Sequence, residues 1–91
     1  MASSESRYEL VFKKSVAKDL RSLPKQDVKR ILERISSLAV NPRPAACEKL
    51  TGAERYRIRQ GIYRIVYEIH DRRLLVLIVT VAHRRDVYKP R

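Results

Sequence analysis

The stretch that most limits how this chain can fold is residues 74–82, where Thr80 is the only polar side chain. A strand that is apolar on both faces is typical of the interior of a sheet, because both of its sides need cover. The stretch is much shorter than the roughly 20 residues that a membrane-spanning helix needs. A chain of 91 residues has room for one hydrophobic core. We therefore expect a single domain over residues 8–91, preceded by a flexible segment at residues 1–7.

The first half of the chain predicts one strand and two helices. Alternation of apolar and polar residues over 8–12 favours a strand. Ser15 is suited to cap a short helix, which Pro24 interrupts. Apolar residues at helical spacing then predict a longer helix that ends at Asn41-Pro42. The side chains expected to face the core are Val16, Leu20 and Leu23 in the first helix and Val28, Ile31, Leu32, Ile35 and Leu38 in the second.

Three further strands are predicted in the second half, after an irregular connection at 43–54 in which Gly52 marks a turn. These strands span 55–59, 62–69 and 74–81, and hairpin turns at Gln60-Gly61 and Asp71-Arg72 join them. The order of elements indicates an α+β fold: a strand, two antiparallel helices and a three-stranded antiparallel meander. The helices are expected to pack on one face of the sheet.

The excess of positive charge favours a polyanionic partner. The chain carries 21 Lys and Arg against 10 Asp and Glu, a net charge of +11. Residues 55–91 contribute +7 of this charge, and nine of their ten basic residues are arginines. A guanidinium group binds phosphate oxygens in pairs, which a lysine does not. Nucleic acid, an anionic membrane surface and an acidic protein all fit this charge, whereas a merely solvated surface usually mixes both signs.

A two-residue hairpin at Gln60-Gly61 would bring three arginines to one face of the sheet. It would place Arg57 opposite Arg64, with Arg59 on the same face. Opposed arginines repel each other, and such breaks of local rules occur most often at functional sites. We expect an anion to relieve this repulsion. The alternative is that Glu68, on the same face, neutralises the cluster, although one carboxylate cannot satisfy three guanidinium groups of five donors each.

Two residues after the apolar stretch are candidates for chemistry. His83 carries the one nearby side chain of a type that ordinarily titrates near neutral pH, which suits proton transfer. Tyr88 offers a ring for base stacking and a hydroxyl that could orient a phosphate. The structural alternatives are that His83 only ends the strand and that Tyr88 only fastens the C-terminus. We interpret His70, beside a turn, as structural.

The sequence gives no sign of a metal, a cofactor or a disulfide. Cys47 is the only cysteine, so no internal disulfide can form. We find no paired carboxylates, no metal-binding spacing and no glycine-rich phosphate loop. A metal-dependent nuclease needs converging acids, which Glu68, Asp71 and Asp86 do not provide. The N-terminus lacks the apolar run of a signal peptide, so we expect a cytoplasmic protein that uses neither metal nor membrane.

Three blocks of sequence resemble a known family: residues 56–59, residues 61–67 with Tyr63-Arg64-Ile65-Val66-Tyr67, and residues 81–88 with His83-Arg84-Arg85-Asp86-Val87-Tyr88. Asn41-Pro42 before Lys49-Leu50 also matches. From Tyr8 onward the chain resembles the RelE branch of the RelE/ParE toxin superfamily. The resemblance implies a type II toxin that cleaves mRNA in the ribosomal A site and is held inactive by a cognate antitoxin.

The resemblance also implies roles for individual residues. Arg64 looks like the family's phosphate-stabilising arginine, and Arg84 like its second arginine, for the phosphate and the leaving oxygen. Tyr88 looks like the tyrosine that orients or stacks the substrate. Arg57 and Arg59 stand where well-studied relatives have lysines, and an arginine hardly loses its proton, so they are expected to give electrostatic support.

These departures leave the general base to be chosen from the sequence itself, and His83 is our candidate. RNA supplies its own nucleophile, the 2′-hydroxyl, so cleavage requires proton transfer and charge neutralisation but no metal. The products would be a 2′,3′-cyclic phosphate and a 5′-hydroxyl. The further basic residues expected to contact RNA are Arg55, Arg85, Lys89 and Arg91.

Two other functions remain open at this point. One is a ParE-like inhibitor of gyrase without RNase activity, although that branch generally lacks the set Arg64, Arg84 and Tyr88. The other is a nucleic-acid-binding module that cuts nothing. For the toxin, the expected partners are the ribosome, mRNA and an antitoxin. An acidic segment of that antitoxin, with an amphipathic helix, would cover the basic face or displace a C-terminal element.

Overall fold

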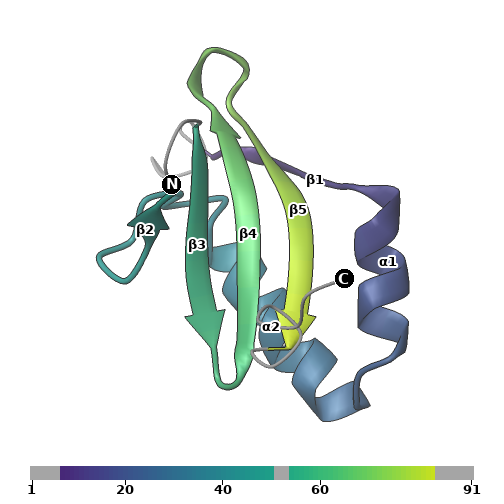
Figure 1. Ribbon diagram of the computed structural model, residues 1–91. Helices are drawn as coiled ribbons and strands as arrows, with labels where there is room; N and C mark the ends of the chain where they lie inside the picture. The colour runs from purple at the N-terminus through teal and green to yellow at the C-terminus, as the bar shows by residue number, and fades with distance from the viewer. Residues whose placement is uncertain (1–6, 51–53, 84–91) are drawn as a thin grey trace.

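The computed structural model describes residues 7–50 and 54–83, and its elements confirm the predicted α+β class (Figure 1). Five strands form one sheet in the order β1-β5-β4-β3-β2, and two helices pack on it. Strands β3, β4 and β5 make the predicted antiparallel meander. In chain order the elements are β1 (Glu9–Phe12), α1 (Lys14–Arg21), α2 (Lys25–Ser37), β2 (Glu48–Lys49), β3 (Arg55–Gln60), β4 (Tyr63–His70), a 3₁₀-helix (Asp71–Arg73) and β5 (Leu75–His83).

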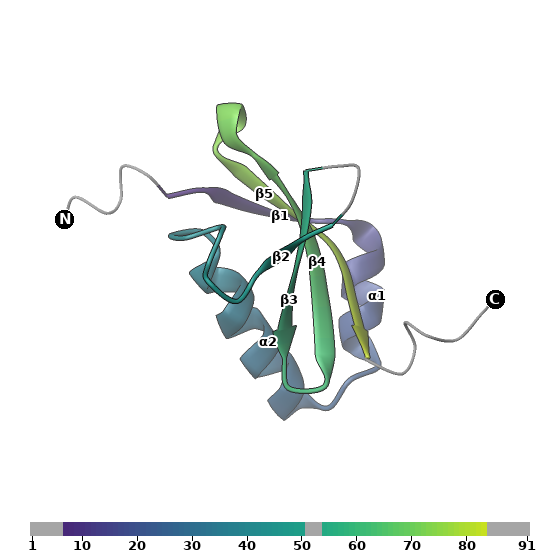
Figure 2. The same ribbon diagram turned by 60° about the vertical axis from the view of Figure 1, so that its left-hand side comes forward.

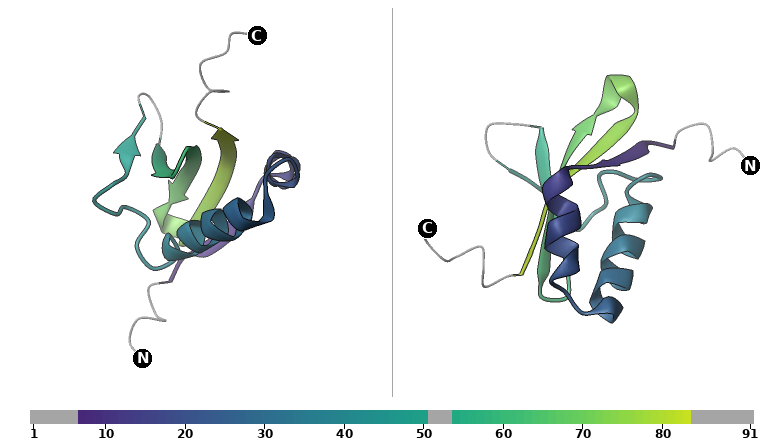
Figure 3. Two further views of the ribbon diagram at one scale, coloured as in Figure 1. Left: turned by 90° about the horizontal axis from the view of Figure 1, so that it is seen from below. Right: turned by 90° about the vertical axis from the view of Figure 1, so that its right-hand side faces the viewer.

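The first strand makes the sheet mixed. β1 runs parallel to β5, with Leu10 beside Val76 and Phe12 beside Ile78. Parallel neighbours need a crossover connection between them, and the chain from α1 to β4 provides it. Both helices belong to this connection, between β1 and the meander in sequence. They cover the same face of the sheet (Figure 3).

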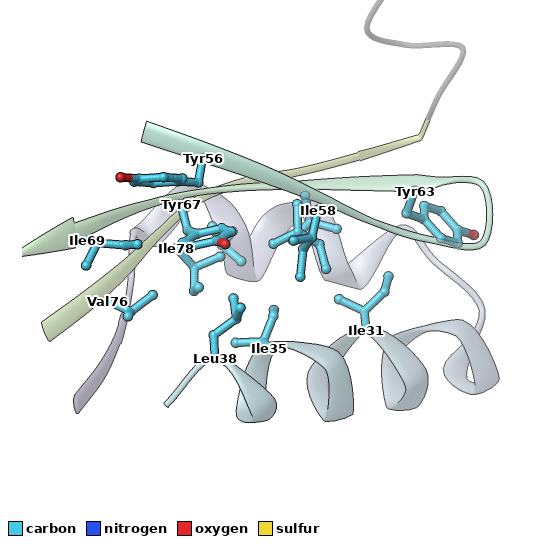
Figure 4. Close-up of a cluster of buried hydrophobic side chains, with 13 residues drawn as sticks. Ile31, Ile35, Leu38, Tyr56, Ile58, Tyr63, Tyr67, Ile69, Val76 and Ile78 are labelled. Carbon is cyan, nitrogen blue, oxygen red and sulfur yellow. The ribbon is translucent and has the colours of Figure 1, made fainter. Parts of the chain in front are cut away.

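The core lies between α2 and this face (Figure 4). Ile31 and Ile35 on α2, and Leu38 directly after its last residue, form one stripe and are fully buried. Leu32, which we expected in the core, is 38% exposed, because only the stripe at positions i, i+4 and i+7 of this helix faces the sheet. The buried residues on the sheet and on α1 are Val16, Tyr56, Ile58, Tyr63, Ile65, Tyr67, Ile69, Val76, Ile78 and Val81, against which Leu20 and Leu23 pack.

The ends of the helices differ from the prediction. α1 begins at Lys14, so Ser15 lies inside the helix and no side chain caps it. The reason is that the chain passes directly from β1 into α1, with the backbone N–H of Lys13 still bonded to the Ile78 carbonyl. α2 ends at Ser37, ahead of Asn41-Pro42, and a turn follows it.

The connections also differ in detail. The predicted irregular connection contains β2, a two-residue strand that pairs with β3, and the turn expected at Gly52 lies outside the described residues. The loop between β3 and β4 is Gly61-Ile62, one residue later than predicted, with Gly61 at a φ of +60°. Between β4 and β5 the chain forms the 3₁₀-helix in place of a two-residue turn.

An ionic cluster lies near that 3₁₀-helix, at the end of β4 opposite the β3–β4 hairpin. The guanidinium group of Arg43 donates two hydrogen bonds to Asp71, of 3.2 and 2.9 Å, and a third of 3.2 Å to the Tyr56 hydroxyl. The Tyr8 hydroxyl donates to the same Asp71 carboxylate at 2.7 Å. Arg43 and then Tyr8 hold the pKa of Asp71 down at about 2. This cluster joins the segment after α2 to the turn before β5.

Candidate nucleic-acid interface

Four arginines share the face of the sheet that points away from the helices. Arg55, Arg57 and Arg59 alternate along β3 with the buried Tyr56 and Ile58, and Arg64 lies opposite Arg59 on β4. We call these four residues the arginine face. The sequence predicted the common face of Arg57, Arg59 and Arg64, and the pairing confirms it.

The predicted pairing within this face was wrong. Arg64 lies opposite Arg59, and Arg57 lies opposite Val66. The difference follows from the hairpin, whose loop begins one residue later than expected and so moves the register by two positions. A shift of two residues keeps every side chain on its face, because side chains alternate with a period of two. The repelling pair is therefore Arg59–Arg64, beside the hairpin.

The two members of this pair have different surroundings. Arg64 is 7% exposed and is the only buried charged side chain within residues 7–50 and 54–83. Arg59 is exposed, and in the part of the chain that the structure describes it forms no ion pair with a carboxylate. Both line a depression of about 100 Å³, together with Gly61, Ile62 and Tyr63. Arg64 is thus buried within the sheet surface, and Arg59 extends into solvent beside it.

The other two arginines have acidic partners. Arg55 donates to Glu68 at 2.9 Å, and His70 lies 3.1 Å from the other oxygen of the same carboxylate. Burial alone would raise the pKa of Glu68, but the bonds from Arg55 and His70 outweigh it and lower that pKa. Glu68 therefore neutralises Arg55, not the three arginines that we considered. His70 has the structural contact that we expected.

Arg57 is paired with Glu48, which was not among the predicted site residues. Glu48 lies opposite Arg57 in the pairing of β2 with β3, and its carboxylate accepts a hydrogen bond from the guanidinium group. No pattern in the sequence indicates this contact, because β2 has only two residues and is a strand only by virtue of its pairing with β3.

His83 is the last residue of β5 and lies opposite Tyr63, at the same rim of the sheet as the hairpin. Its ring stands edge-on to that of Tyr63, with 5.7 Å between the ring centroids. Tyr63 belongs to the helix-covered face, so His83 and Arg64 project to opposite faces. A β-bulge causes this: Val66 pairs with Thr80 and Tyr67 with Ile78, which leaves Val79 as an extra residue.

The hairpin that carries Arg59 and Arg64 is tied to the start of α2 (Figure 2). The Tyr63 hydroxyl donates to the Asp27 carboxylate at 2.6 Å. This bond and then burial raise the pKa of Tyr63. Asp27 and Tyr63 also line a depression of about 230 Å³ between helix and hairpin.

The remaining predicted site residues lie outside the described part of the chain: Arg84, Arg85, Tyr88, Lys89 and Arg91. Within the described ranges no three His, Cys, Asp or Glu side chains gather closely enough to hold a metal ion, and no helix there is long and apolar enough to cross a bilayer. A metal-free reaction stays a prediction.

Known proteins resemble this chain in both sequence and fold. Residues 10–88 match the family model described as ParE toxin of type II toxin–antitoxin system. Putative toxin RelE1 of Methanocaldococcus jannaschii is 30% identical over 87 residues, which is 91% of this chain and 97% of that protein.

Two solved complexes contain chains of the same fold. A chain of the RelBE2 toxin–antitoxin complex of Mycobacterium tuberculosis superposes with a TM-score of 0.77, at 28% identity over 86% of this chain and 92% of that one. A chain of the archaeal RelE–RelB complex of Pyrococcus horikoshii gives 0.75, at 31% identity over 86% and 96%. On these matches of sequence and structure, this chain belongs to the ParE/RelE family of type II toxin–antitoxin toxins.

Proposed function

We propose that this toxin is a metal-independent endoribonuclease that cleaves mRNA in the ribosomal A site and so inhibits translation. The observation that supports it best is the Arg59–Arg64 pair, two arginines at directly opposed positions of β3 and β4, on the face of the sheet that points away from the helices. Like charges at directly opposed positions of a strand pair repel each other, and an RNA phosphate, whose oxygens match guanidinium donors, would offset that repulsion. The RelE names of similar proteins support the same reading.

In the proposed reaction the 2′-hydroxyl attacks the adjacent phosphate, and negative charge builds up on the phosphorane oxygens. A guanidinium group that is already fixed in place stabilises this charge without reorganising during the reaction. The buried Arg64 meets this condition, and the exposed Arg59 can close on the phosphate from the other side. By the family resemblance, Arg84 assists the leaving oxygen and Tyr88 orients the substrate.

We retain His83 as the proposed proton acceptor. The bulge directs His83 to the helix-covered face. The reacting nucleotide must therefore extend past the rim of the sheet, which the β3–β4 hairpin and the end of β5 form. The RNA would then contact Arg64 on one side of the rim and His83 on the other.

A cognate antitoxin and a cytoplasmic location complete the proposal. Both solved complexes named above pair a toxin of this fold with an antitoxin. The net charge of +11 would attract an acidic segment of such a partner.

Primer extension on translated mRNA, under single-turnover conditions, tests the RNase activity. Arg64→Ala should slow cleavage by about two to three orders of magnitude, the usual effect of removing one group that stabilises transition-state charge. Arg64→Lys, which keeps the charge but not the planar fork, should recover part of the rate. Arg72→Ala removes the same charge from the exposed 3₁₀-helix at the other end of β4 and should cleave normally.

Thermal melting of Arg64→Ala separates a lost contact from a lost fold. A folded Arg64→Ala protein that cleaves within about threefold of wild type would contradict the assignment. Intact mRNA together with double-strand DNA breaks would favour gyrase as the target, and RNA binding without any cut product would favour a binding module.

A further inference from the structure

A further depression, besides the two described above, lies beside the Arg59–Arg64 pair, toward the edge of the sheet. It measures about 360 Å³ and is lined by Ala46, Glu48, Arg57 and Arg59. Arg59 therefore contributes to this depression and to the smaller one that contains Arg64. A guanidinium group has five N–H donors, enough to serve an anion on each side.

The arginines of β3 repeat at a fixed interval. Arg57 and Arg59 are two residues apart on one strand, which separates their Cα atoms by roughly 6.6–6.8 Å. This interval is comparable to the separation of successive phosphates in an extended single strand of RNA. A strand of RNA with one phosphate at Arg59–Arg64 can thus place the neighbouring phosphate between Arg57 and Arg59.

Glu48 occupies this second position in the free protein. Its carboxylate binds Arg57, whose side chain is 20% exposed, while the side chain of Glu48 is 66% exposed. The pair is weakened on the Glu48 side, because water reaches this exposed carboxylate and screens its charge, and because the side chain loses freedom when it pairs. Glu48 also sits on a two-residue edge strand, so it can leave Arg57 without disturbing the core.

We propose that Arg57 and Arg59 form a second phosphate subsite, and that the RNA backbone must displace Glu48 from Arg57 to fill it. The inference rests on the proposed function in that RNA is the ligand. RNA fits better than an acidic peptide because a phosphodiester presents two oxygens to two arginines that line one depression, and because its charges recur at the interval of the arginines. Glu48 is then a built-in competitor that weakens binding of RNA.

The test is the binding of a single-stranded oligoribonucleotide whose 2′-hydroxyls are all O-methylated, so that it cannot be cleaved. Fluorescence anisotropy at about 0.1 M salt should show Glu48→Gln binding about two- to fivefold more tightly than wild type. The plot of log K against log salt concentration should also become steeper by about 0.7, the contribution of one more phosphate contact on a single strand.

Two controls separate a local effect from a general change of charge. Glu33→Gln makes the same change at an exposed position of α2, on the other side of the sheet, and should leave binding close to wild type. In an Arg57→Ala background, Glu48→Gln should give no gain, because the pair that it breaks is already absent.

Three results would overturn the proposal. One is equal binding by the Glu48→Gln and Glu33→Gln proteins, and another is a gain that persists in the Arg57→Ala background. The third is a gain with an oligoglutamate peptide but not with the oligoribonucleotide, which would assign the position to an acidic protein segment. If no variant binds the oligoribonucleotide, the subsite is excluded, whereas cleavage of ribosomal mRNA by the wild type would still uphold the proposed function.

Discussion

The extra residue Val79 determines which face of the sheet His83 joins. Before the bulge, Val76 and Ile78 face the helices, and after it Val81 and His83 do so. Strict alternation from Ile78 would have sent Thr80 and Ala82 into the core and His83 to the arginine face. The bulge instead buries Val81 and places Ala82 beside Arg64.

The role of His83 can be tested by the pH dependence of cleavage. If His83 accepts the proton, the single-turnover rate of wild type should rise as pH is raised from about 5.5 to 8, because only a neutral imidazole can accept a proton. His83→Gln should be slower by about two to four orders of magnitude and should lose this rise. Rates that stay level across the range in both proteins would exclude His83 as the base.

The β3–β4 hairpin is held in place by an unusually direct contact with α2. Tyr63 precedes Arg64 in β4, and its hydroxyl reaches Asp27 in the first turn of the helix. Since neighbouring residues on a strand project to opposite faces, fixing Tyr63 on one face also fixes the backbone from which Arg64 projects on the other. Because the contact raises the pKa of Tyr63 above its ordinary value, the stabilisation is lost only as pH rises through that raised pKa.

Removing this hydroxyl should affect both stability and cleavage. Tyr63→Phe should lower the free energy of unfolding by about 1–2 kcal/mol, the value of a hydrogen bond to a charged group that is partly solvated. It should also slow cleavage by about tenfold, because the hairpin loses its fixed position. Denaturant unfolding and the cleavage assay measure the two effects.

Tyr8→Phe is the matched control, since it removes a hydroxyl that donates to another aspartate, Asp71, at the other end of the sheet. It should lose stability without losing activity. Equal activity of Tyr63→Phe and Tyr8→Phe would show that the contact with α2 stabilises the fold and does not position the site.

The elements that the sequence predicted are those with a strong internal pattern. The stripe of α2 and the alternation of β3 are repeated over several residues, so they were visible without the structure. Which side chains of the meander lie on the same face of the sheet was predictable for the same reason. The loop at Gly61-Ile62 was not, because several short loops fit the same pattern and only the paired strands select one.

Features that depend on distant pairing stayed hidden. β2 has no periodicity of its own, so its Glu48 could not be recognised as the partner of Arg57. The parallel place of β1 beside β5 and the bulge at Val79 follow from how the strands fit together in the sheet. The common face of the arginines was therefore predictable from local alternation, whereas their partners and the orientation of His83 were not.

Across the whole molecule, positive side chains outnumber negative ones by about two to one. If each of the 10 acidic side chains neutralised one of the 21 basic ones, 11 positive charges would remain. The molecule measures 42 × 32 × 25 Å over the Cα atoms. At about 0.01 M salt the Debye length is about 30 Å, so most of these charges interact with one another, whereas at 0.15 M it is about 8 Å.

Salt should therefore stabilise this protein, although it weakens the individual ion pairs on its surface. Between about 0.01 and 0.3 M NaCl we expect Tm to rise by several degrees, which for a domain of this size corresponds to about 1 kcal/mol. Loss of the exposed pairs opposes this rise only weakly, since each contributes at most about 1 kcal/mol and is partly screened in any case. Differential scanning calorimetry at several salt concentrations measures the balance.

A variant with fewer charges separates repulsion from other effects of salt. Lys14, Lys25 and Lys29 are exposed on the first turns or near the starts of the two helices, where positive charge also opposes the helix dipole. Changing all three to Gln should raise Tm at low salt and flatten its dependence on salt concentration, without touching the arginine face. A wild-type Tm that falls as salt is added would mean that the ion pairs, with Arg43–Asp71 foremost, outweigh the net charge. In that case an acidic partner would gain nothing by relieving repulsion, and its affinity would have to come from the contacts it makes.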